Sequence, residues 1–297
     1  MRLAITGAAG FVGRAVVRQL AALHPEVDLL LADQEVAGFD GHETLAGDLT
    51  DPAVIAALTA PRVDAVLHLA ALPGGAAERD PEASRAINLD VPLALIAAMR
   101  GRRLVIAGSI AVFGGAQPDP VDDATVPAPA SVYGTHKRMV ELAFADAVRR
   151  DAVSGFALRL PGIVARPAAA GGFGSAFLSD IFHTALAGTP LRVPVAADAS
   201  SWLMSVRCCA ANLVAAALGE RTAQAAVTLP ALRVTIGDLV AELARHGDVS
   251  GIRFEEVPAT RATFGSYPGL ATPRADALGF RHDGSLTQLV ETVLADL

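Results

Sequence analysis

Residues 2–13 read Arg-Leu-Ala-Ile-Thr-Gly-Ala-Ala-Gly-Phe-Val-Gly, an apolar strand-like run that leads into three glycines. A helical pattern follows, with Val16, Val17 and Leu20 at helical spacing. Glycines at a strand-to-helix junction permit a tight turn, close approach of the backbone to a pyrophosphate, and close packing of the helix. The unpaired N–H groups and the dipole at that helix N-terminus favour an anion. The stretch therefore predicts a strand, turn and helix that bind a dinucleotide.

The adjoining sequence indicates which dinucleotide. The glycines are spaced G-x-x-G-x-x-G, one residue longer at the front than the usual fingerprint. A second strand is predicted over 27–32, and it ends in Asp33, 20 residues beyond the last of these glycines. A carboxylate there accepts hydrogen bonds from the adenosine ribose and would repel a 2′-phosphate. Since residues 19–61 contain no Lys or Arg, no local cation is expected to offset that repulsion, and NAD is predicted over NADP.

A second set of residues predicts proton transfer. Tyr133 and Lys137 lie four residues apart on a helix predicted over 131–150, and therefore on one face of it. Ser109 lies 24 residues upstream of Tyr133, at the end of a predicted strand. A free phenol has a pKa near ~10, but a cation about 4 Å away at an effective dielectric of about 20 favours the phenolate by about 4 kcal/mol. Lys137 is the candidate cation, and Ser109 is the candidate anchor for the substrate oxygen.

The order of the elements predicts the fold. Strands and helices alternate, as in an α/β protein with a parallel sheet. We expect a Rossmann-type doubly wound parallel sheet with a smaller α+β C-terminal substrate-binding cap. The NAD-binding domain is predicted over 1–164 with a returning segment at about 206–230, and the cap over 165–205 and 231–297. The further elements expected are 43–46, 51–58, 63–69 before a loop over 70–75, 81–99 with a kink at Pro92, 103–107 and 155–160.

The composition excludes several classes of function. The chain has 297 residues, of which 52% are hydrophobic and 19% charged, and its net charge is −7, which argues against nucleic-acid binding. No apolar stretch reaches about 18 residues, so no membrane span is expected. A strand that begins at residue 2 leaves no room for a signal peptide. Cys208 and Cys209 are adjacent and suit neither a disulfide framework nor a metal site. The cytoplasm is the expected location.

Several motifs, taken in order, resemble the extended short-chain dehydrogenase/reductase superfamily, that is, the NAD-dependent epimerase/dehydratase superfamily. Within it, segments 109–115, 159–167 and 202–213 resemble D-erythronate dehydrogenases and related sugar-acid dehydrogenases. Two departures leave the substrate open: Gly108 replaces a usual Ser, and the loop 72–79 differs. The superfamily motifs are Gly7-x-x-Gly10-x-x-Gly13, Asp33, Gly47-Asp48-Leu49, His68-Leu69-Ala70-Ala71, Asn88, Ser109 to Gly114 and Tyr133-x-x-x-Lys137.

The resemblance implies a hydride transfer from the substrate carbon to NAD while a tyrosine takes the hydroxyl proton. Tyr133 is then the general base, Lys137 stabilises its phenolate, and Ser109 holds the substrate hydroxyl. The cofactor-binding residues implied are Gly7, Ala9, Gly10, Phe11, Val12, Gly13, Asp33, Asp48, Leu49, Leu69, Ala70, Ala71, Asn88, Ser109, Tyr133, Lys137, Pro161 and Ile163. The substrate-binding residues expected are Gly74, Gly75, Ser109, Arg166 and Arg207.

The arginines follow from the predicted substrate. A sugar acid needs a partner for its carboxylate, and a bidentate Arg is the usual one. Arg166 and Arg207 are the candidates because both fall in the segments that resemble sugar-acid dehydrogenases. A surface or interdomain salt bridge is an equal alternative for each. Arg159 lies in mid-strand and is expected to serve the structure.

Three other polar residues are expected to support the fold. His68 ends an apolar strand and is predicted to be a packed, hydrogen-bonded core histidine. His136 falls on another face of the helix than Tyr133 and Lys137 and is expected to face solvent. Asn88 is expected to bind backbone near the cofactor. By analogy with the superfamily, the helices at 81–99 and 131–150 would pair with those of a second subunit in a homodimer.

Three alternatives remain open. An NAD-dependent sugar-nucleotide epimerase or dehydratase uses the same trio but retains its NADH during turnover. A dinucleotide-sensing protein would bind NAD without turning over any alcohol. A dehydrogenase of another small hydroxy acid or amino alcohol, such as threonine, would differ only in its substrate.

Overall fold

The computed structural model describes residues 1–115, 117–167, 174–219 and 223–297. Contacts divide the chain into two compact units. The first unit comprises Met1–Val112, Pro129–Leu160 and Ala210–Thr228. The second unit comprises Phe113–Ala128, Pro161–Cys209 and Leu229–Leu297. The segment 113–128, which the sequence placed with the NAD-binding domain, thus groups with the second unit.

The first unit is built on a seven-stranded sheet in the order β10-β6-β5-β4-β1-β2-β3. Each pair of neighbouring strands is parallel. From β1 the chain adds β2 and β3 on one side, and it then crosses over to add β4, β5 and β6 on the other side. The carboxyl ends of β1 and β4 therefore flank the switch point where such sheets bind ligands. The strands are β1 (Arg2–Thr6), β2 (Asp28–Asp33), β3 (Glu43–Ala46), β4 (Ala65–His68), β5 (Arg103–Ser109), β6 (Ser154–Leu160) and β10 (Ala223–Thr228).

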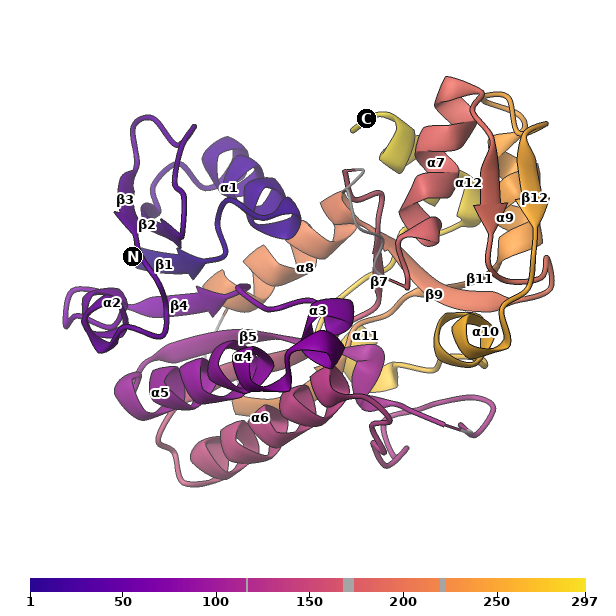
Figure 1. The fold of residues 1–297 in the computed structure, drawn as a ribbon. Helices are drawn as coiled ribbons and strands as arrows, with labels where there is room; N and C mark the ends of the chain where they lie inside the picture. Colours follow the sequence, from indigo (N-terminus) through magenta and orange to yellow (C-terminus); the bar gives the residue numbers. More distant parts are fainter. Residues whose placement is uncertain (116, 168–173, 220–222) are drawn as a thin grey trace. The chain divides into compact units, whose positions relative to one another are not determined.

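Helices cover both faces of this sheet. Figure 1 shows α1 and α8 on one face and α4, α5 and α6 on the other. The helices are α1 (Phe11–Leu23), α2 (Pro52–Leu58), α3 (Gly74–Arg79), α4 (Pro81–Arg85), α5 (Val91–Ala98), α6 (Val132–Arg149) and α8 (Val206–Leu218), of which α8 enters this unit at Ala210, with a 3₁₀ turn at Ile110–Val112. The doubly wound fold that the sequence predicts is therefore confirmed.

The helix predicted over 81–99 differs from the expectation in one respect. It is divided into α4, a π-helical turn at Ala86–Asp90, and α5. Pro92 lies in the first turn of α5. A proline lacks the N–H that would bond to the fourth residue before it, and a π turn supplies a different hydrogen-bonding register at that place. The loop predicted over 70–75 ends earlier than expected, because α3 begins at Gly74.

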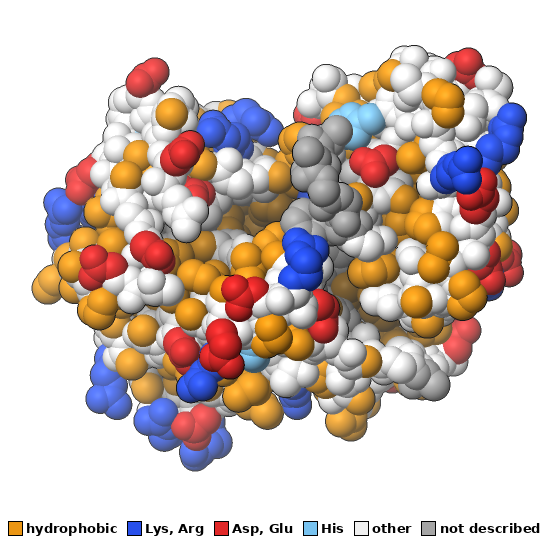
Figure 2. Space-filling model, in the orientation of Figure 1, with side chains coloured by type: hydrophobic (Ala, Val, Ile, Leu, Met, Phe, Trp, Pro, Cys, Tyr) orange, Lys and Arg blue, Asp and Glu red, His pale blue; other side chains and the backbone are white. Residues whose placement is uncertain are grey.

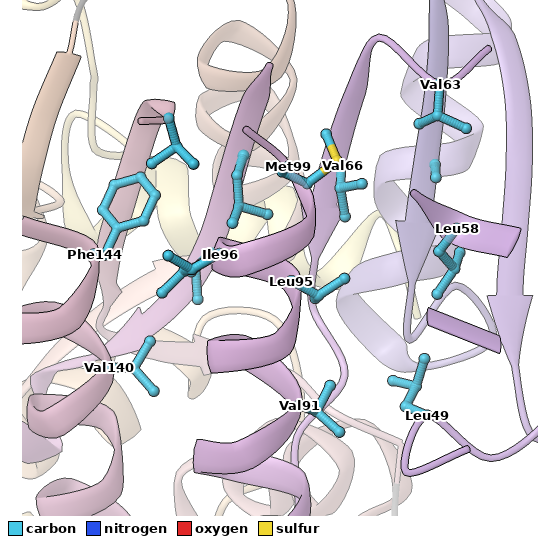
Figure 3. Packing of buried hydrophobic residues seen from close by; sticks show 14 of the residues in the cluster. Leu49, Leu58, Val63, Val66, Val91, Leu95, Ile96, Met99, Val140 and Phe144 are labelled. Carbon is cyan, nitrogen blue, oxygen red and sulfur yellow. The ribbon is translucent and has the colours of Figure 1, made fainter. Parts of the chain in front are cut away.

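The core of the first unit explains why α6 is held in one place. Alternate strand residues, such as Leu104 and Ile106, join one cluster with the apolar faces of α2, α5 and α6. Figure 3 shows Ile96 of α5 beside Phe144 of α6, and Met99 against Val66 of β4. Burial of each such side chain stabilises the fold by about 1.5–3 kcal/mol. The face of α6 that carries Tyr133 and Lys137 is therefore fixed relative to the sheet.

The second unit has its own small sheets and core. One sheet has the order β11-β9-β7, and β8 pairs with β12. Trp202 is fully buried and lies against Phe113, at 6.2 Å between ring centroids, and Tyr267, at 4.8 Å. The elements are β7 (Gly162–Val164), α7 (Phe177–Ala187), β8 (Leu191–Val193), β9 (Ser200–Ser205), β11 (Leu232–Thr235), α9 (Ile236–Leu243), β12 (Ile252–Phe254), α10 (Pro258–Phe264), α11 (Pro273–Ala277) and α12 (Leu286–Leu294). Over the described part of the chain, no helix combines the length and apolarity that a membrane span requires.

Candidate active site

The glycine turn after β1 is shaped by contacts that exclude side chains. Gly7 has φ +69°, and a Cβ there would lie 2.6 Å from the Ala70 nitrogen. A Cβ at Gly13 would lie 2.1 Å from the Gly7 oxygen. The N-cap of α1 is Gly10, and among the described residues no side chain caps this helix end. The turn therefore leaves helix N–H groups for an anion, and its main chain fits the pyrophosphate of NAD.

Asp33 is fixed at the carboxyl end of β2. Its Oδ2 accepts a hydrogen bond from the Ala9 nitrogen at 2.9 Å, and its Oδ1 accepts one from the Gln34 nitrogen at 2.8 Å. The carboxylate is thus tied to the glycine turn itself. This is the position that reaches the adenosine ribose in dinucleotide-binding sheets.

One cation reaches the loop after β2 from outside residues 19–61. Arg14, on the first turn of α1, donates from Nε to the Ala9 oxygen at 3.0 Å. Its guanidinium lies 5.1 Å from the centroid of the Phe39 ring, in the loop after β2. Asp33 and Arg14 thus bind the nitrogen and the oxygen of the same residue, Ala9. A count of charges along residues 19–61 could not find Arg14, because the cation reaches this loop from the preceding helix.

Asp33→Ser is expected to bring NADP into use. The change removes the carboxylate that repels a 2′-phosphate and leaves the Arg14 cation nearby, so the Kd for NADP should fall at least about tenfold, or about 1.4 kcal/mol. Titration of cofactor binding by calorimetry measures this. Asp33→Asn separates charge from shape, and Arg14→Ala in the Asp33→Ser background should reverse the gain. An unchanged NADP affinity in Asp33→Ser would contradict the role given to Asp33.

The carboxyl end of β4 carries a buried histidine. His68 Nδ1 lies 2.7 Å from Thr6 Oγ1, and the residue is 1% exposed. Burial, with a smaller contribution from the Lys137 charge, lowers the pKa of His68 to about 3, so the ring is neutral. The prediction of a hydrogen-bonded core histidine is confirmed. Its Nε2 has no hydrogen-bond partner among the residues that the structure describes.

Asn88 lies in the π-helical turn and binds main chain beyond β4. Its Oδ1 accepts from the Leu72 nitrogen at 2.9 Å, and its Nδ2 donates to the Leu72 oxygen at 2.9 Å. The expected backbone contact is confirmed. It holds the segment that follows Leu69, Ala70 and Ala71, the three residues predicted to line the cofactor.

Helix α6, which carries Tyr133 and Lys137, begins at a capped end close to β5. Ser131 Oγ accepts from the Gly134 nitrogen at 3.0 Å. A Cβ at Gly134 would lie 2.1 Å from the Ala111 oxygen, so glycine is what lets α6 approach the turn after β5. Ser109 ends that strand, and its Oγ accepts from the Ala111 nitrogen at 3.1 Å. The helix start and the strand end therefore meet.

Lys137 is buried beneath this junction. It is 2% exposed, its Nζ donates to the Ala107 oxygen of β5 at 2.9 Å, and Nζ lies 5.5 Å from the centroid of the Tyr133 ring. Burial lowers the pKa of Lys137 from 10.5 to about 8, so the side chain is still a cation at neutral pH. A Cβ at Gly74 would lie 3.9 Å from Tyr133 Cγ. The structure thus gathers Tyr133, Lys137, Gly74 and the end of β5 in one place.

Four predicted site residues belong to the second unit. Pro161 and Ile163 flank the start of β7, and their place at the nicotinamide stays a prediction. Arg166 Nη2 donates to Ser175 Oγ at 2.9 Å, and the Arg166 nitrogen donates to Ser179 Oγ at 3.0 Å.

Arg207 differs from Arg166 in its surroundings. It lies in the first turn of α8 with an exposed side chain, and its guanidinium pairs with the Asp296 carboxylate. Asp296 lies just beyond α12, at the carboxyl end of the chain. A substrate carboxylate at Arg207 would have to displace that partner. Arg166 also has an acidic neighbour, because burial raises the pKa of Asp180 and the charge of Arg166 lowers it.

Two further expectations have definite outcomes. Arg159 serves the structure, as predicted: its Nε and Nη2 bind Glu141 Oε1 and Oε2 at 2.8 and 2.9 Å in a buried pair. The prediction that His136 faces solvent holds only in part, because the side chain is half-buried. Its Nδ1 lies 2.9 Å from the buried Ser84 Oγ of α4, because α4 covers that face of α6.

Comparisons with known proteins bear on this geometry. Residues 3–217 match the model of the family described as "NAD dependent epimerase/dehydratase family". D-erythronate dehydrogenase of Cupriavidus necator is 34% identical, over 100% of this chain and 98% of that protein. The Haemophilus influenzae enzyme of the same name is 29% identical, over 98% of each. A solved structure, a nucleoside-diphosphate-sugar epimerase from Agrobacterium tumefaciens, is 31% identical with a TM-score of 0.89, over 100% of this chain and 94% of that one.

Proposed function

This chain belongs to the NAD-dependent epimerase/dehydratase family, and we propose that it oxidises a secondary alcohol of a small, D-erythronate-like sugar acid with NAD as the acceptor. The observation that carries the chemistry is the buried Lys137 ammonium, 5.5 Å from the Tyr133 ring centroid at the end of β5. The substrate class is supported by full-length similarity to two D-erythronate dehydrogenases.

In the proposed mechanism each member of the trio has one task. Ser109 Oγ holds the substrate hydroxyl oxygen, and Tyr133 removes the hydroxyl proton as the C=O bond forms. Lys137 stabilises the resulting phenolate through its charge, which acts strongly because the site is buried. NAD, when bound, would supply the acceptor for the hydride of the same carbon. Proton and hydride leave one carbinol group, so the alcohol becomes a ketone and NAD becomes NADH.

The carboxylate of the substrate is assigned to Arg166. Charge-assisted hydrogen bonds contribute about 1.5–3 kcal/mol, so Arg166→Ala should raise KM for the acid about 10- to 150-fold and change kcat less. Arg207→Ala should have a smaller effect, since Arg207 already pairs with Asp296. NADH formation at 340 nm, measured across four- to six-carbon aldonic and uronic acids with NAD in excess, tests the substrate class and both variants.

Arg192→Ala is the matched control for these variants, because its pair with Glu255 is on the surface. An unchanged KM in both Arg166→Ala and Arg207→Ala would remove the clamp from the proposal. If no acid gives NADH, the proposal of a sugar-acid substrate is wrong, whereas the family and the cofactor are unaffected. Threonine belongs in the same panel as a small amino alcohol.

The similarity to a nucleoside-diphosphate-sugar epimerase, at 31% identity and a TM-score of 0.89, favours a second candidate function. An epimerase returns the hydride to its substrate, so nucleotide sugars would be converted without net NADH. A dehydrogenase releases one NADH for each ketone formed. Stoichiometric NADH from an acid, with none from nucleotide sugars, would decide for the dehydrogenase.

We also propose that the enzyme is a homodimer that acts in the cytoplasm. The outer face of α6 supports a dimer, because Met139 and Leu142 are 46% and 55% exposed and large apolar side chains on one helix face often mark an interface. Sedimentation equilibrium measures the subunit number, and a monomer at all concentrations would exclude the dimer.

A further inference from the structure

One polar relay in the first unit is not needed for the catalytic trio. It consists of Asn88, Ser84 and His136, and it starts at the main chain of Leu72. Asn88 Nδ2 donates to Ser84 Oγ at 3.0 Å, and Ser84 Oγ lies 2.9 Å from His136 Nδ1. Asn88 and Ser84 are fully buried. Such a chain in the interior has a definite direction, because each group must find a partner of the opposite kind.

That direction can be worked out from its fixed end. Leu72 presents both its N–H and its C=O to the Asn88 side chain, so the orientation of the amide is determined. The second amide hydrogen of Asn88 then points at Ser84 Oγ, which accepts it. The Ser84 hydroxyl can then give its own hydrogen to Nδ1 of a neutral His136, and we assign Nδ1 as the acceptor of this bond. In this assignment the His136 ring is neutral and carries its hydrogen on Nε2.

The relay connects two parts of the proposed site. Leu72 lies between Ala71, which is expected to line the cofactor, and Gly74, which lies beside Tyr133. At the other end, His136 immediately precedes Lys137 on α6. The π-helical turn is what carries Asn88, between α4 and α5. The segment 69–75, which is a loop as far as Pro73 and then the start of α3, is therefore tied to α6 by side chains that do not touch reacting atoms.

We propose that His136 is a positioning residue: through Ser84 and Asn88 it holds the loop 69–75 in the conformation that binds NAD and the substrate. The binding role of that loop rests on the proposed function, whereas the tether itself is independent of it. Protonation of the ring would put a hydrogen on Nδ1 and reverse its bond with Ser84, whose hydroxyl would have to turn away from His136. The loop is expected to loosen as the pH falls through the range in which His136 titrates.

The surroundings of His136 keep the ring neutral near pH 7. Burial is the largest effect and lowers the pKa of His136. The carboxylates of Asp90, in the π turn, and of Glu82, on α4, raise this pKa, and Arg85 of α4 lowers it. Glu78 of α3 and His136 line one surface groove, and Glu78 accepts from the Val132 nitrogen. Lys137 and Arg138 follow His136 on α6 itself. Figure 2 shows acidic side chains gathered over α3 and α4. The net shift is downward, so the relay is intact at neutral pH and lost in acid.

Three variants separate positioning from simple packing. His136→Asn offers an oxygen near the place of Nδ1 that can accept from Ser84 but cannot titrate in this range. His136→Leu and Ser84→Ala both remove the link. In these two, hydrogen exchange of the 69–75 amides should speed up at least about tenfold, and KM for NAD should rise about three- to tenfold with kcat within about twofold.

The pH dependence provides the sharper test. The wild type should lose NAD affinity as the pH falls below about 6.5, the ordinary pKa of a histidine, because burial lowers the pKa of His136. His136→Asn should match the wild type above this pH and show a flatter profile below it. His246→Leu, which removes a histidine of the second unit, is the control and should follow the wild type throughout.

Hydrogen exchange and NAD titration need no substrate, so a failed sugar-acid assay leaves this test intact. Wild-type exchange at 69–75 in both His136→Leu and Ser84→Ala would overturn the proposal. A His136→Asn profile as steep as that of the wild type would overturn it as well.

Discussion

Tyr133→Phe is expected to lower kcat by about 10²–10⁴-fold, the usual contribution of a positioned acid or base. The change removes one oxygen and leaves a ring of the same shape over Lys137, so the fold and NAD affinity should stay close to those of the wild type. Initial rates of NADH formation and a cofactor titration measure the two effects. A variant that kept more than about a third of kcat would show that another group takes the proton.

The chain supplies a matched control, because it contains two tyrosines. Tyr267 is buried in the second unit, where burial raises its pKa to about 12 and its ring packs on Trp202. Tyr267→Phe should therefore keep kcat within about threefold, a difference below 1 kcal/mol in activation free energy. The pair of variants tests the position of the phenol rather than its presence.

Glu141→Gln is expected to lower the free energy of unfolding by about 3–5 kcal/mol, the range seen when one partner of a buried ion pair is removed. Glu141 is 1% exposed at its side chain and binds Arg159, which is 9% exposed. The amide removes the Glu141 charge that binds Arg159 between α6 and β6 and that also pairs with Arg138. Urea unfolding of the NAD-free protein at pH 7, followed by circular dichroism, measures the difference.

A surface pair in the same protein serves as the control. Arg192 and Glu255 also meet at 2.9 Å, but their side chains are 80% and 52% exposed. Glu255→Gln should cost less than about 1 kcal/mol. A loss of that small size in Glu141→Gln would mean that water reaches the buried pair, and replacing Glu141 and Arg159 together by Met should restore much of the stability.

Local sequence patterns predicted the parts of the fold whose causes are local. The strand, glycine turn and first helix follow from patterns within about ten residues, and Gly13 is needed there because it approaches the Gly7 oxygen. The close approach of Gly7 to Ala70, by contrast, involves a residue that is remote in the sequence. The alternating strands and the apolar face of α6 likewise follow from short-range periodicity. Asp33 could be placed because a strand end fixes the residue that emerges from it.

The departures have causes that are remote in the sequence. His136 was assigned to the correct face of α6, but the residue that covers that face, Ser84, lies 52 positions away. Arg14 reaches a loop 23 positions further on. The π turn before Pro92 has nearly the same spacing of apolar residues as an α-helix, so the sequence pattern could not distinguish the two. The segment 113–128 follows β5 in sequence but packs with Trp202 and residues near 269.

The buried Lys137 implies that activity and stability are in competition in this enzyme. Its pKa is about 8 in the folded chain against 10.5 ordinarily, so the unfolded chain binds more protons between these values, and the free energy of unfolding should rise with pH across that window. At neutral pH the charge opposes folding. Selection for heat resistance without selection for turnover would be expected to replace this lysine early, as active-site residues often reduce stability. A Lys137→Met protein that unfolds at higher urea than the wild type, yet forms no NADH, would be a direct measurement of that competition.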